Sequence, residues 1–430
     1  MRVGVAVVDI TPPPGLSMAG FGIRTESAVG CHDHLTVRAI AIDNFAIACV
    51  DVLALDRATT ARIREKCSLS SENVIVTALH THGGPETLAN RRHPGLNSIF
   101  LTDMEIACVR AIDEAVASQR PATIRAGLGC DPKVAKNRRH SGGITDSTLP
   151  VLQFSDTNGK IIAIIVSYAC HPVVLGADNR LWTADYPGSV RDQLEQRSPD
   201  SVAIFLTGCA GDANTGHSAH ASNTLSSNTL RTFEQAELFA AAIVTCVAKA
   251  RLTEVSGEVA IANHEVQLGF ERREQGSLHE LMHAWRKEME TAGLTQRTML
   301  LSWIEWAERM LPVSIERLTS PARVTVLRLG DVEIIALPGE IFAETAHAIR
   351  RRISSDNAFI IGFADDDPGY IAPSSEYPYG GYEIDEAHRY YGMPSTFARG
   401  SAELLADVAV DLVSQVRSRR PHAMVSSKAK

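Results

Sequence analysis

Two histidines separated by a single residue, His80 and His82, follow a short apolar run and precede a Gly-Gly-Pro turn. The apolar run, residues 74–79, is typical of a buried β-strand, and the glycines and proline indicate where it ends. Side chains at positions i and i+2 of an extended segment point to the same side, so both imidazoles are expected to face one cavity. Imidazole binds metal ions and carries protons near neutral pH. The pattern predicts a metal site with a neighbouring proton carrier, and a hydrogen-bonded strand end is the simpler alternative.

Three more apolar segments are followed by residues that could bind the same ion. His171, Glu340 and Tyr370 each come shortly after a predicted strand. Catalytic zinc sites use imidazole nitrogen and carboxylate oxygen and keep one position for water, whereas a phenol is a rare zinc ligand. Strand ends from both halves of the chain therefore predict one shared cavity, in which Tyr370 is the weakest ligand by its chemistry.

Two other pairs of histidines are alternative metal ligands. His32 and His34 flank an aspartate before a predicted hairpin, where such a residue more often forms local turn hydrogen bonds. His217 and His220 lie in a stretch rich in serine and asparagine, residues 216–230. We interpret this stretch as a mobile loop, since its composition does not favour a helix that would hold both imidazoles on one face.

The hydrophobic periodicity indicates an α/β protein whose mixed β-sheets are flanked by helices. Predicted hairpins cover residues 36–50, 149–168 and 323–337, and predicted helices cover residues 57–67, 100–118, 233–250, 278–311 and 341–353. The helical pair at 278–311 carries Trp285, Trp303 and Trp306, which we expect to pack against a sheet rather than face a lipid.

The ligand candidates come from both halves of the chain, and no clean linker separates the halves. We therefore predict a single composite domain over residues 1–416, in which both halves contribute to the site. Residues 417–430 are basic and poor in apolar residues, which predicts a disordered tail.

Composition excludes several classes of protein. The chain has 430 residues, of which 45% are hydrophobic and 21% charged, as expected for a soluble globular protein. A net charge of −8 provides no basic surface for nucleic acid. No apolar run approaches the roughly 20 residues that span a bilayer, and the N-terminus lacks a secretory signal. The eight cysteines contain no C-x-x-C pair and mostly lie in apolar runs, so we expect reduced thiols in a cytoplasmic protein.

Six short motifs occur together in one order: His80-Thr81-His82, Tyr168-Ala169-Cys170-His171-Pro172, Ala184-Asp185-Tyr186-Pro187-Gly188, Gly211-Asp212, Leu337-Pro338-Gly339-Glu340 and Gly369-Tyr370-Ile371. In these motifs and their order, the chain resembles the catalytic domain of the neutral/alkaline ceramidase family over roughly residues 3–415. The resemblance implies one zinc ion per chain, with His80, His171, Glu340 and Tyr370 as its ligands.

The resemblance also assigns residues that contact the substrate. They are His82, Arg138 in an Asn-Arg pair, and Tyr382, which falls twelve residues after the ligand tyrosine as in the family. Asn214 stands where ceramidases have a serine. Because asparagine is not a nucleophile, we predict that Asn214 orients substrate or water and forms no covalent intermediate.

From these residues we predict a zinc-dependent amidohydrolase that cleaves the carbon–nitrogen bond of a small soluble substrate with a zinc-activated water. His82 or Tyr382 would stabilise the oxyanion, and His82 would protonate the leaving amine. Arg138 would bind a carboxylate on the substrate.

A lactone or ester hydrolase with the same zinc site and a non-catalytic metal-dependent binding protein are the alternatives. Ceramidases carry an export signal and a C-terminal immunoglobulin-like domain that this sequence lacks, so we expect a substrate other than ceramide. A homo-oligomer is compatible with the sequence.

Overall fold

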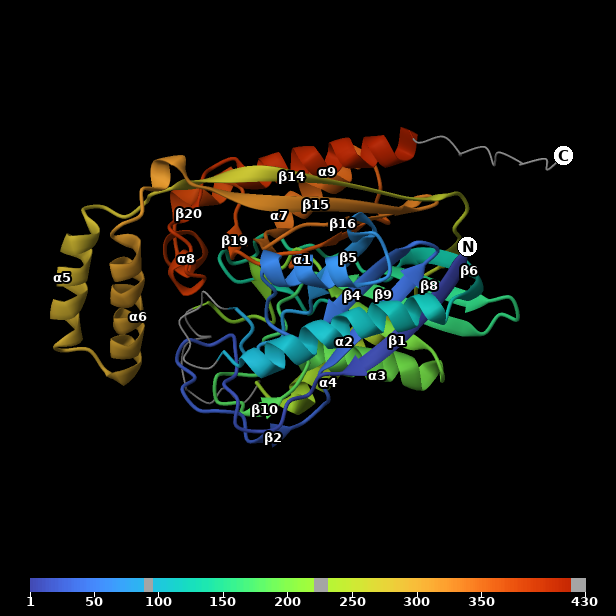
Figure 1. The fold of residues 1–430 in the computed structure, drawn as a ribbon, viewed down its shortest axis with the longest axis horizontal. Coiled ribbons are helices and arrows are strands. Elements are labelled where there is room, and N and C mark those ends of the chain that lie inside the picture. Colours follow the sequence, from blue (N-terminus) through green and yellow to red (C-terminus); the bar gives the residue numbers. More distant parts are fainter. Residues whose placement is uncertain (89–95, 220–230, 419–430) are drawn as a thin grey trace.

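Mixed β-sheets with helices on their outer sides make up the structure, a computed structural model that describes residues 1–88, 96–219 and 231–418 (Figure 1). The larger sheet has the strand order β11 (Val202–Thr207), β9 (Ile161–Tyr168), β8 (Pro150–Asp156), β6 (Arg120–Leu128), β1 (Arg2–Asp9), β3 (Thr36–Ile42), β4 (Phe45–Val50) and β5 (Val74–Ala78), and β13 (Thr253–Glu254) also pairs with β6. The outermost pairs, β11 with β9 and β4 with β5, are parallel, whereas the pairs between them are antiparallel. The predicted fold class is confirmed.

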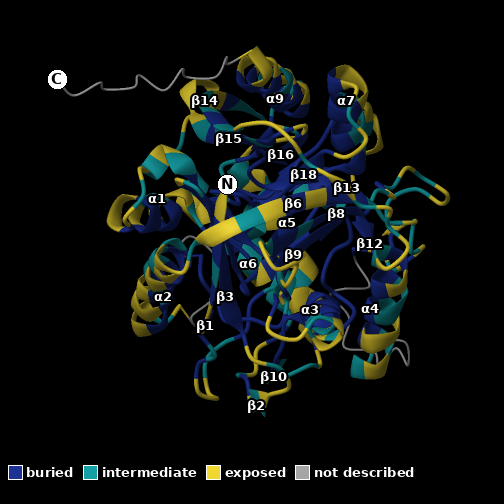
Figure 2. Ribbon diagram, turned by 90° about the vertical axis from the view of Figure 1, so that its right-hand side faces the viewer, coloured by how far each residue is buried: buried dark blue, intermediate teal, exposed yellow. Residues whose placement is uncertain are grey.

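Both faces of the larger sheet are covered. One face packs against α1 (Arg57–Lys66) and α2 (Ser98–Ala117), and the other packs against α3 (Asp185–Arg197), α4 (Phe233–Val247) and the second sheet. Strands β3 and β4 are consequently buried at every position, as in sheets that have no solvent-facing side. Figure 2 shows the same division, with buried strands inside and exposed residues on the outward faces of α2 and α4.

The second sheet has the order β18 (Phe359–Ile361), β16 (Val332–Ala336), β15 (Thr319–Leu329), β14 (Val259–Glu271) and β20 (Thr396–Phe397). Helices α7 (Ala343–Ile353) and α9 (Ser401–Ser418) cover its outer face. Neither β14 nor α9 was predicted from the sequence. Arg417, which we expected in the tail, lies in α9 and donates to Glu333 at 2.7 Å; residues 419–430 of the expected tail lie outside the described residues.

A short segment after β18, residues 362–365, joins the two sheets. The N–H of Gly362 donates to the carbonyl of Thr207 at the end of β11, and the N–H of Ala78 at the end of β5 donates to the carbonyl of Phe363. The segment therefore lies between the two outermost strands of the larger sheet. It brings the carboxyl ends of β5, β9 and β11 close to the region where the short parallel strands β17 (Glu340–Ile341) and β19 (Tyr370–Ile371) pair.

The hairpin of α5 (Leu278–Met289) and α6 (Leu294–Met310) projects from the sheets at the left of Figure 1. Our expectation that its tryptophans pack against a sheet is wrong. The guanidinium of Arg389 lies 5.2, 4.4 and 5.6 Å from the ring centres of Trp285, Trp303 and Trp306. Cation–π attraction and burial thus attach the hairpin to α8 (Ala387–Tyr390). Within the described ranges, no helix is both long and apolar enough to cross a membrane.

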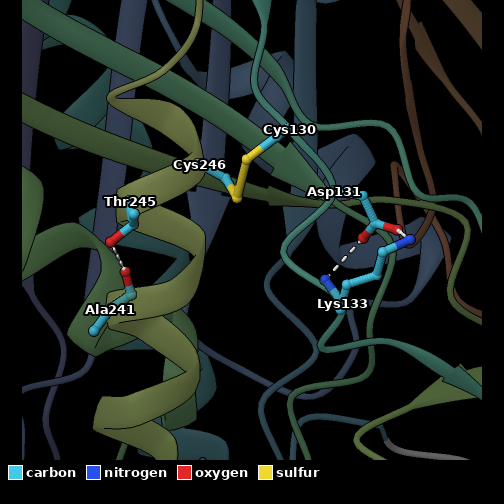
Figure 3. Close-up of a disulfide and its surroundings, with 6 residues drawn as sticks. All are labelled: Cys130, Asp131, Lys133, Ala241, Thr245 and Cys246. Atoms are coloured by element: carbon cyan, nitrogen blue, oxygen red, sulfur yellow. Dashed lines mark hydrogen bonds and ion pairs between the residues drawn. A yellow bond between two sulfur atoms is a disulfide. The ribbon is translucent and has the colours of Figure 1, made fainter.

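A disulfide joins Cys130 to Cys246, 116 residues apart in sequence (Figure 3). The prediction that all eight cysteines are reduced is wrong for this pair. No local motif revealed the bridge, because the fold itself brings the segment after β6 beside the last turn of α4. The remaining cysteines are free thiols, and apart from Cys31 they are buried.

Replacing both bridged cysteines by serine should lower the free energy of unfolding by about 2–4 kcal/mol, because the disulfide restricts a long loop in the unfolded chain. Urea denaturation of the wild type, with and without a thiol reductant, and of the Cys130→Ser/Cys246→Ser variant measures the change. Cys31→Ser is the matched control and should leave the stability unaltered. Equal stability of oxidised and reduced wild type would contradict the prediction.

Candidate metal centre

His80 and His82 lie side by side, although for a different reason than the strand pattern suggested. Strand β5 ends at Ala78, and His80 has a left-handed backbone conformation with φ of +68°. The N–H of His80 donates to the carbonyl of Val52 at 3.0 Å, which fixes this turn. The two imidazole rings meet edge to face with centres 5.2 Å apart. The two rings are therefore brought together by a turn after the strand, and not by the alternation of side chains between the two faces of a strand.

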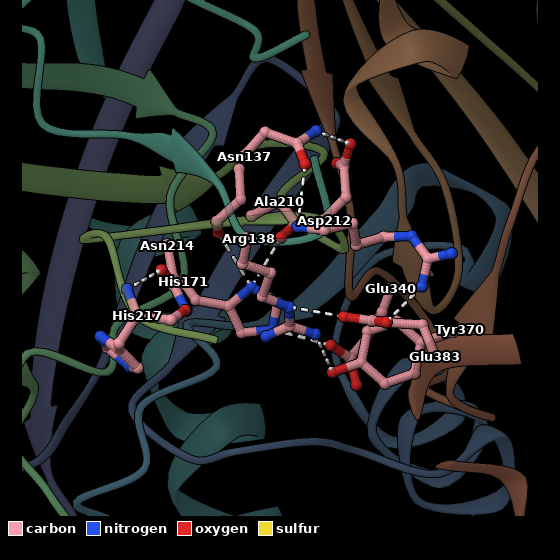
Figure 4. A network of polar contacts seen from close by, with 12 residues as sticks. Asn137, Arg138, His171, Ala210, Asp212, Asn214, His217, Glu340, Tyr370 and Glu383 are labelled. Atoms are coloured by element: carbon pink, nitrogen blue, oxygen red, sulfur yellow. Dashed lines mark hydrogen bonds and ion pairs between the residues drawn. The ribbon is translucent and has the colours of Figure 1, made fainter. Parts of the chain in front are cut away.

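The ring nitrogens of His80 and His171 and the carboxylate of Glu340 form a buried group whose ligand atoms all lie within 4.8 Å of one another. Nε2 of His171 is 2.8 Å from Oε2 of Glu340, and Nε2 of His80 is 3.6 Å from the same oxygen (Figure 4 shows the first contact). Each residue is at most 1% exposed. The predicted ligands from both halves of the chain are thus brought to one point.

The outer nitrogens of both imidazoles face backbone carbonyls. Nδ1 of His80 is 2.8 Å from the carbonyl of Leu53, and Nδ1 of His171 is 2.6 Å from that of Ala210. A carbonyl oxygen only accepts, so each Nδ1 carries a proton and a neutral ring then has a lone pair on Nε2. When Nε2 carries no proton, two lone pairs face the Glu340 carboxylate, and a cation between them is needed to make this contact favourable. This donor set fits a divalent metal such as zinc.

Glu340 is held as a carboxylate. Burial alone would raise the pKa of its carboxyl group, but positive charge on protonated His80 and the hydrogen bond donated by protonated His171 lower the pKa to about 2. A bound metal ion would take the place of those Nε2 protons. The hydroxyl of Tyr391 donates to Oε1, the oxygen that points away from the histidines. Tyr391 was not predicted from the sequence, because no motif surrounds it.

Tyr370 is the strand neighbour of Glu340, because these two residues pair across β17 and β19. Its hydroxyl accepts from Nη2 of Arg138 at 2.7 Å, and Nε of Arg138 donates to Glu383 at 2.8 Å. Burial raises the pKa of Tyr370 well above its ordinary value, and the cation of Arg138 opposes this rise. Arg138 is itself buried, with its side chain 5% exposed. The guanidinium of Arg138 therefore bridges the hydroxyl of Tyr370 and the carboxylate of Glu383.

His82 and Tyr382 flank the centre and are half-buried, unlike the ligand group. The His82 ring packs 4.9 Å from Phe21, and a side chain at Gly20 would come within 2.4 Å of its Nδ1. The absence of a side chain at Gly20 thus makes room for this imidazole. The Tyr382 ring meets that of Tyr370 edge to face at 5.9 Å. Both flanking residues thus lie beside the predicted ligands, His82 next to His80 and Tyr382 next to Tyr370.

Asn214 is fully buried, and its side chain serves its own turn. Its amide NH₂ donates to the carbonyl of His217 at 2.8 Å, and its amide oxygen accepts from the N–H groups of Gly216 and His217. The backbone of the same loop supports the predicted ligand His171, because the carbonyl of Ala213 accepts from the N–H of His171. Figure 4 shows Asn214 and His217 on one side of His171, with Glu340 and Tyr370 on the other.

The alternative histidine clusters do not form a comparable group. His32 pairs with Asp33 at 2.9 Å and His34 with Asp9 at 2.9 Å, both near the surface. Among the residues that the structure describes, no third ligand joins either pair. His220, part of the other alternative, lies outside the described residues.

Comparisons with known proteins support the resemblance to the neutral/alkaline ceramidase family. The family model for the N-terminal part of neutral/alkaline non-lysosomal ceramidases matches residues 1–292, which include His80 and His171. The fold is similar to that of neutral ceramidase from Pseudomonas aeruginosa, with a TM-score of 0.74, 18% identity, and coverage of 98% of this chain and 75% of that chain. A ceramidase complexed with C2 has a TM-score of 0.72, 17% identity, and coverage of 98% and 76%.

His80→Ala and His171→Ala should each abolish stoichiometric metal binding, because each removes one of the converging ligand atoms. Elemental analysis of the purified variants measures this, and circular dichroism verifies that they fold. His32→Ala is the control and should retain the wild-type metal content. Retention of metal in either of the first two variants would place the site elsewhere.

Tyr391→Phe should weaken metal binding by roughly 10-fold while leaving the ligands in place, because it removes the hydrogen bond that orients the Glu340 carboxylate. Competition with a fluorescent zinc chelator measures the affinity. Tyr390→Phe is the matched control, since that hydroxyl accepts from Trp303 instead. Equal affinities of the two variants would contradict the role of Tyr391.

Proposed function

The chain belongs to the neutral/alkaline non-lysosomal ceramidase family, and on this premise we propose that it is a zinc-dependent hydrolase of an amide bond in a small substrate. One observation carries the proposal. Nε2 of His80 and Nε2 of His171 converge on the Glu340 carboxylate, and Nδ1 of each ring faces a backbone carbonyl. Zinc bound there would polarise a carbonyl and lower the pKa of a water molecule.

His82 is the residue best placed to move a proton. Its ring lies 5.2 Å from that of His80 and 6.3 Å from that of His171, and both of its ring nitrogens are shielded from solvent. An imidazole at this position can deliver a proton to a leaving nitrogen near neutral pH. The hydroxyl of Tyr382 is our candidate to donate to the carbonyl oxygen as negative charge develops on it.

Arg138 receives a different role from the one that the sequence suggested. Its paired donors already contact Tyr370 and Glu383 inside the protein, so we assign it to holding Tyr370 in place rather than to binding a substrate carboxylate. We likewise assign Asn214 a structural role, because its side chain holds the backbone of Gly216 and His217. Because neither its amide nor any serine hydroxyl at that position is available as a nucleophile, the proposed hydrolysis uses water directly.

A substrate panel tests the proposal. Metal-loaded protein should hydrolyse a member of a set of N-acyl amines and N-acyl amino acids, lose this activity with a chelator, and regain it with zinc. The set should also contain lactones and a short-chain ceramide, which we expect to be poorer substrates. Turnover of lactones alone would favour the ester hydrolase. Zinc binding without turnover, and without binding of a hydroxamate, would favour the non-catalytic protein.

His82→Ala provides the control that separates catalysis from metal binding. It should keep its zinc and lower kcat by about 10²- to 10⁴-fold, the range for loss of general acid catalysis. Tyr379→Phe, at an exposed position outside the ligand group, should leave kcat unaltered.

A further inference from the structure

The α5–α6 hairpin is attached to the stretch that carries Tyr391, the tyrosine that donates to Glu340. The guanidinium of Arg389 faces the rings of all three hairpin tryptophans and lies closest to Trp303, at 4.4 Å from the ring centre. Nε1 of Trp303 donates to the hydroxyl of Tyr390 at 3.2 Å. The hairpin thus holds residues 389 and 390 at the end of α8 (Figure 1), and the next residue of the chain reaches the candidate metal centre.

Buried charge makes this attachment specific. The side chain of Arg389 is only 8% exposed, and its Nη2 lies 3.5 Å from Oε1 of Glu274, in the segment that precedes α5. Nε2 of His388 lies 3.0 Å from the same oxygen. A buried cation is unfavourable unless an anion or aromatic rings take the place of its water. The hairpin and the segment before it supply both, so Arg389 has one strongly preferred position.

Tyr391 contacts both of the short strands that carry predicted ligands. Its hydroxyl donates to Oε1 of Glu340 in β17. Its ring packs against Gly369, directly before β19, where an added Cβ atom would lie 2.9 Å from the ring. The carbonyl of Gly369 accepts from the N–H of Glu340 at 2.9 Å, and the ring of Tyr391 meets that of Tyr370 edge to face at 6.3 Å. A displaced Tyr391 would therefore leave the Glu340 carboxylate without the hydrogen bond that orients it.

We propose that Arg389 is a positioning residue for the metal centre and that it acts through the α5–α6 hairpin. While the tryptophans hold Arg389, Tyr391 binds one oxygen of Glu340 and leaves the other, Oε2, beside His80 and His171. This role rests on the metal binding of the proposed function and goes beyond it, because it makes an element outside the ligand group a determinant of zinc affinity. Zinc binding and the attachment of the hairpin would then be coupled, each strengthening the other.

Zinc affinity, measured by competition with a fluorescent chelator, tests the proposal on variants whose fold is verified by circular dichroism. Arg389→Met keeps a long side chain but removes the charge, and it should weaken zinc binding by about 3- to 10-fold, as expected for loss of a buried cation–π contact. Arg389→Lys should recover much of this loss, since an ammonium group also binds aromatic faces. Arg286→Met is the matched control: it removes the surface ion pair with Glu308 in the same hairpin and should leave the affinity unaltered.

Two further variants show whether Arg389 acts through Tyr391. Arg389→Met/Tyr391→Phe should bind zinc within about twofold of Tyr391→Phe alone, because both substitutions remove the same orientation of Glu340. Trp303→Leu, at a half-buried position, removes the ring nearest to the guanidinium and keeps Arg389 itself. It should weaken zinc binding by about 2- to 5-fold and provides the test if Arg389→Met does not fold.

Independent losses that multiply in the double variant would overturn the inference, as would an unchanged affinity in folded Arg389→Met or in Trp303→Leu, or an equal loss in Arg286→Met. A wild type that binds no zinc would overturn the proposed function together with this inference. Zinc-bound wild type with unchanged affinity in the Arg389 and Trp303 variants would overturn this inference alone.

Discussion

Two backbone carbonyls determine the chemistry of the centre. By accepting the Nδ1 protons of His80 and His171, the carbonyls of Leu53 and Ala210 leave the inward nitrogens as lone-pair donors beside the Glu340 carboxylate. Neither carbonyl belongs to a motif, and both lie in loops whose course the sheets determine. A flipped ring would direct a proton, and not a lone pair, at the candidate metal position.

The position of the His80 ring depends on unusual backbone conformations. His80 and Phe363 both have left-handed conformations, with φ of +68° and +58°, and their rings stack with centres 4.0 Å apart. Non-glycine residues adopt such conformations at an energetic cost, which the surrounding contacts must offset. Here the offset comes from the segment that joins the sheets, where the carbonyl of Phe363 accepts from Ala78. The geometry of the centre and the association of the two sheets therefore depend on each other.

Much of the site was predictable because metal ligands are chemically distinctive and tend to follow strands. His80, His171 and Glu340 were identified in this way, and the structure brings them together. What escaped prediction depends on contacts between distant parts of the chain. The left-handed turn at His80 looks like a strand in sequence, and Tyr391 reaches Glu340 from another segment without a surrounding motif.

The same limit applies to the fold. Hairpins and amphipathic helices are local patterns, so the α/β class followed from them. The disulfide did not, because Cys130 and Cys246 are brought together only by packing of α4 against the larger sheet. The role of Asn214 was also obscured, since an amide that could face a substrate and one that binds its own turn look alike in sequence.

The tryptophan–arginine contact has a consequence for how the molecule can be observed. Three of the four tryptophans lie in the α5–α6 hairpin around Arg389, and the fourth, Trp182, is buried beside the larger sheet. Intrinsic fluorescence consequently reports mainly on the hairpin and its attachment to α8, whereas far-ultraviolet circular dichroism averages over both sheets. Arg389 also lies in the stretch between Tyr382 and Tyr391. The protein thus contains a native optical reporter placed next to the residues that surround its candidate metal centre.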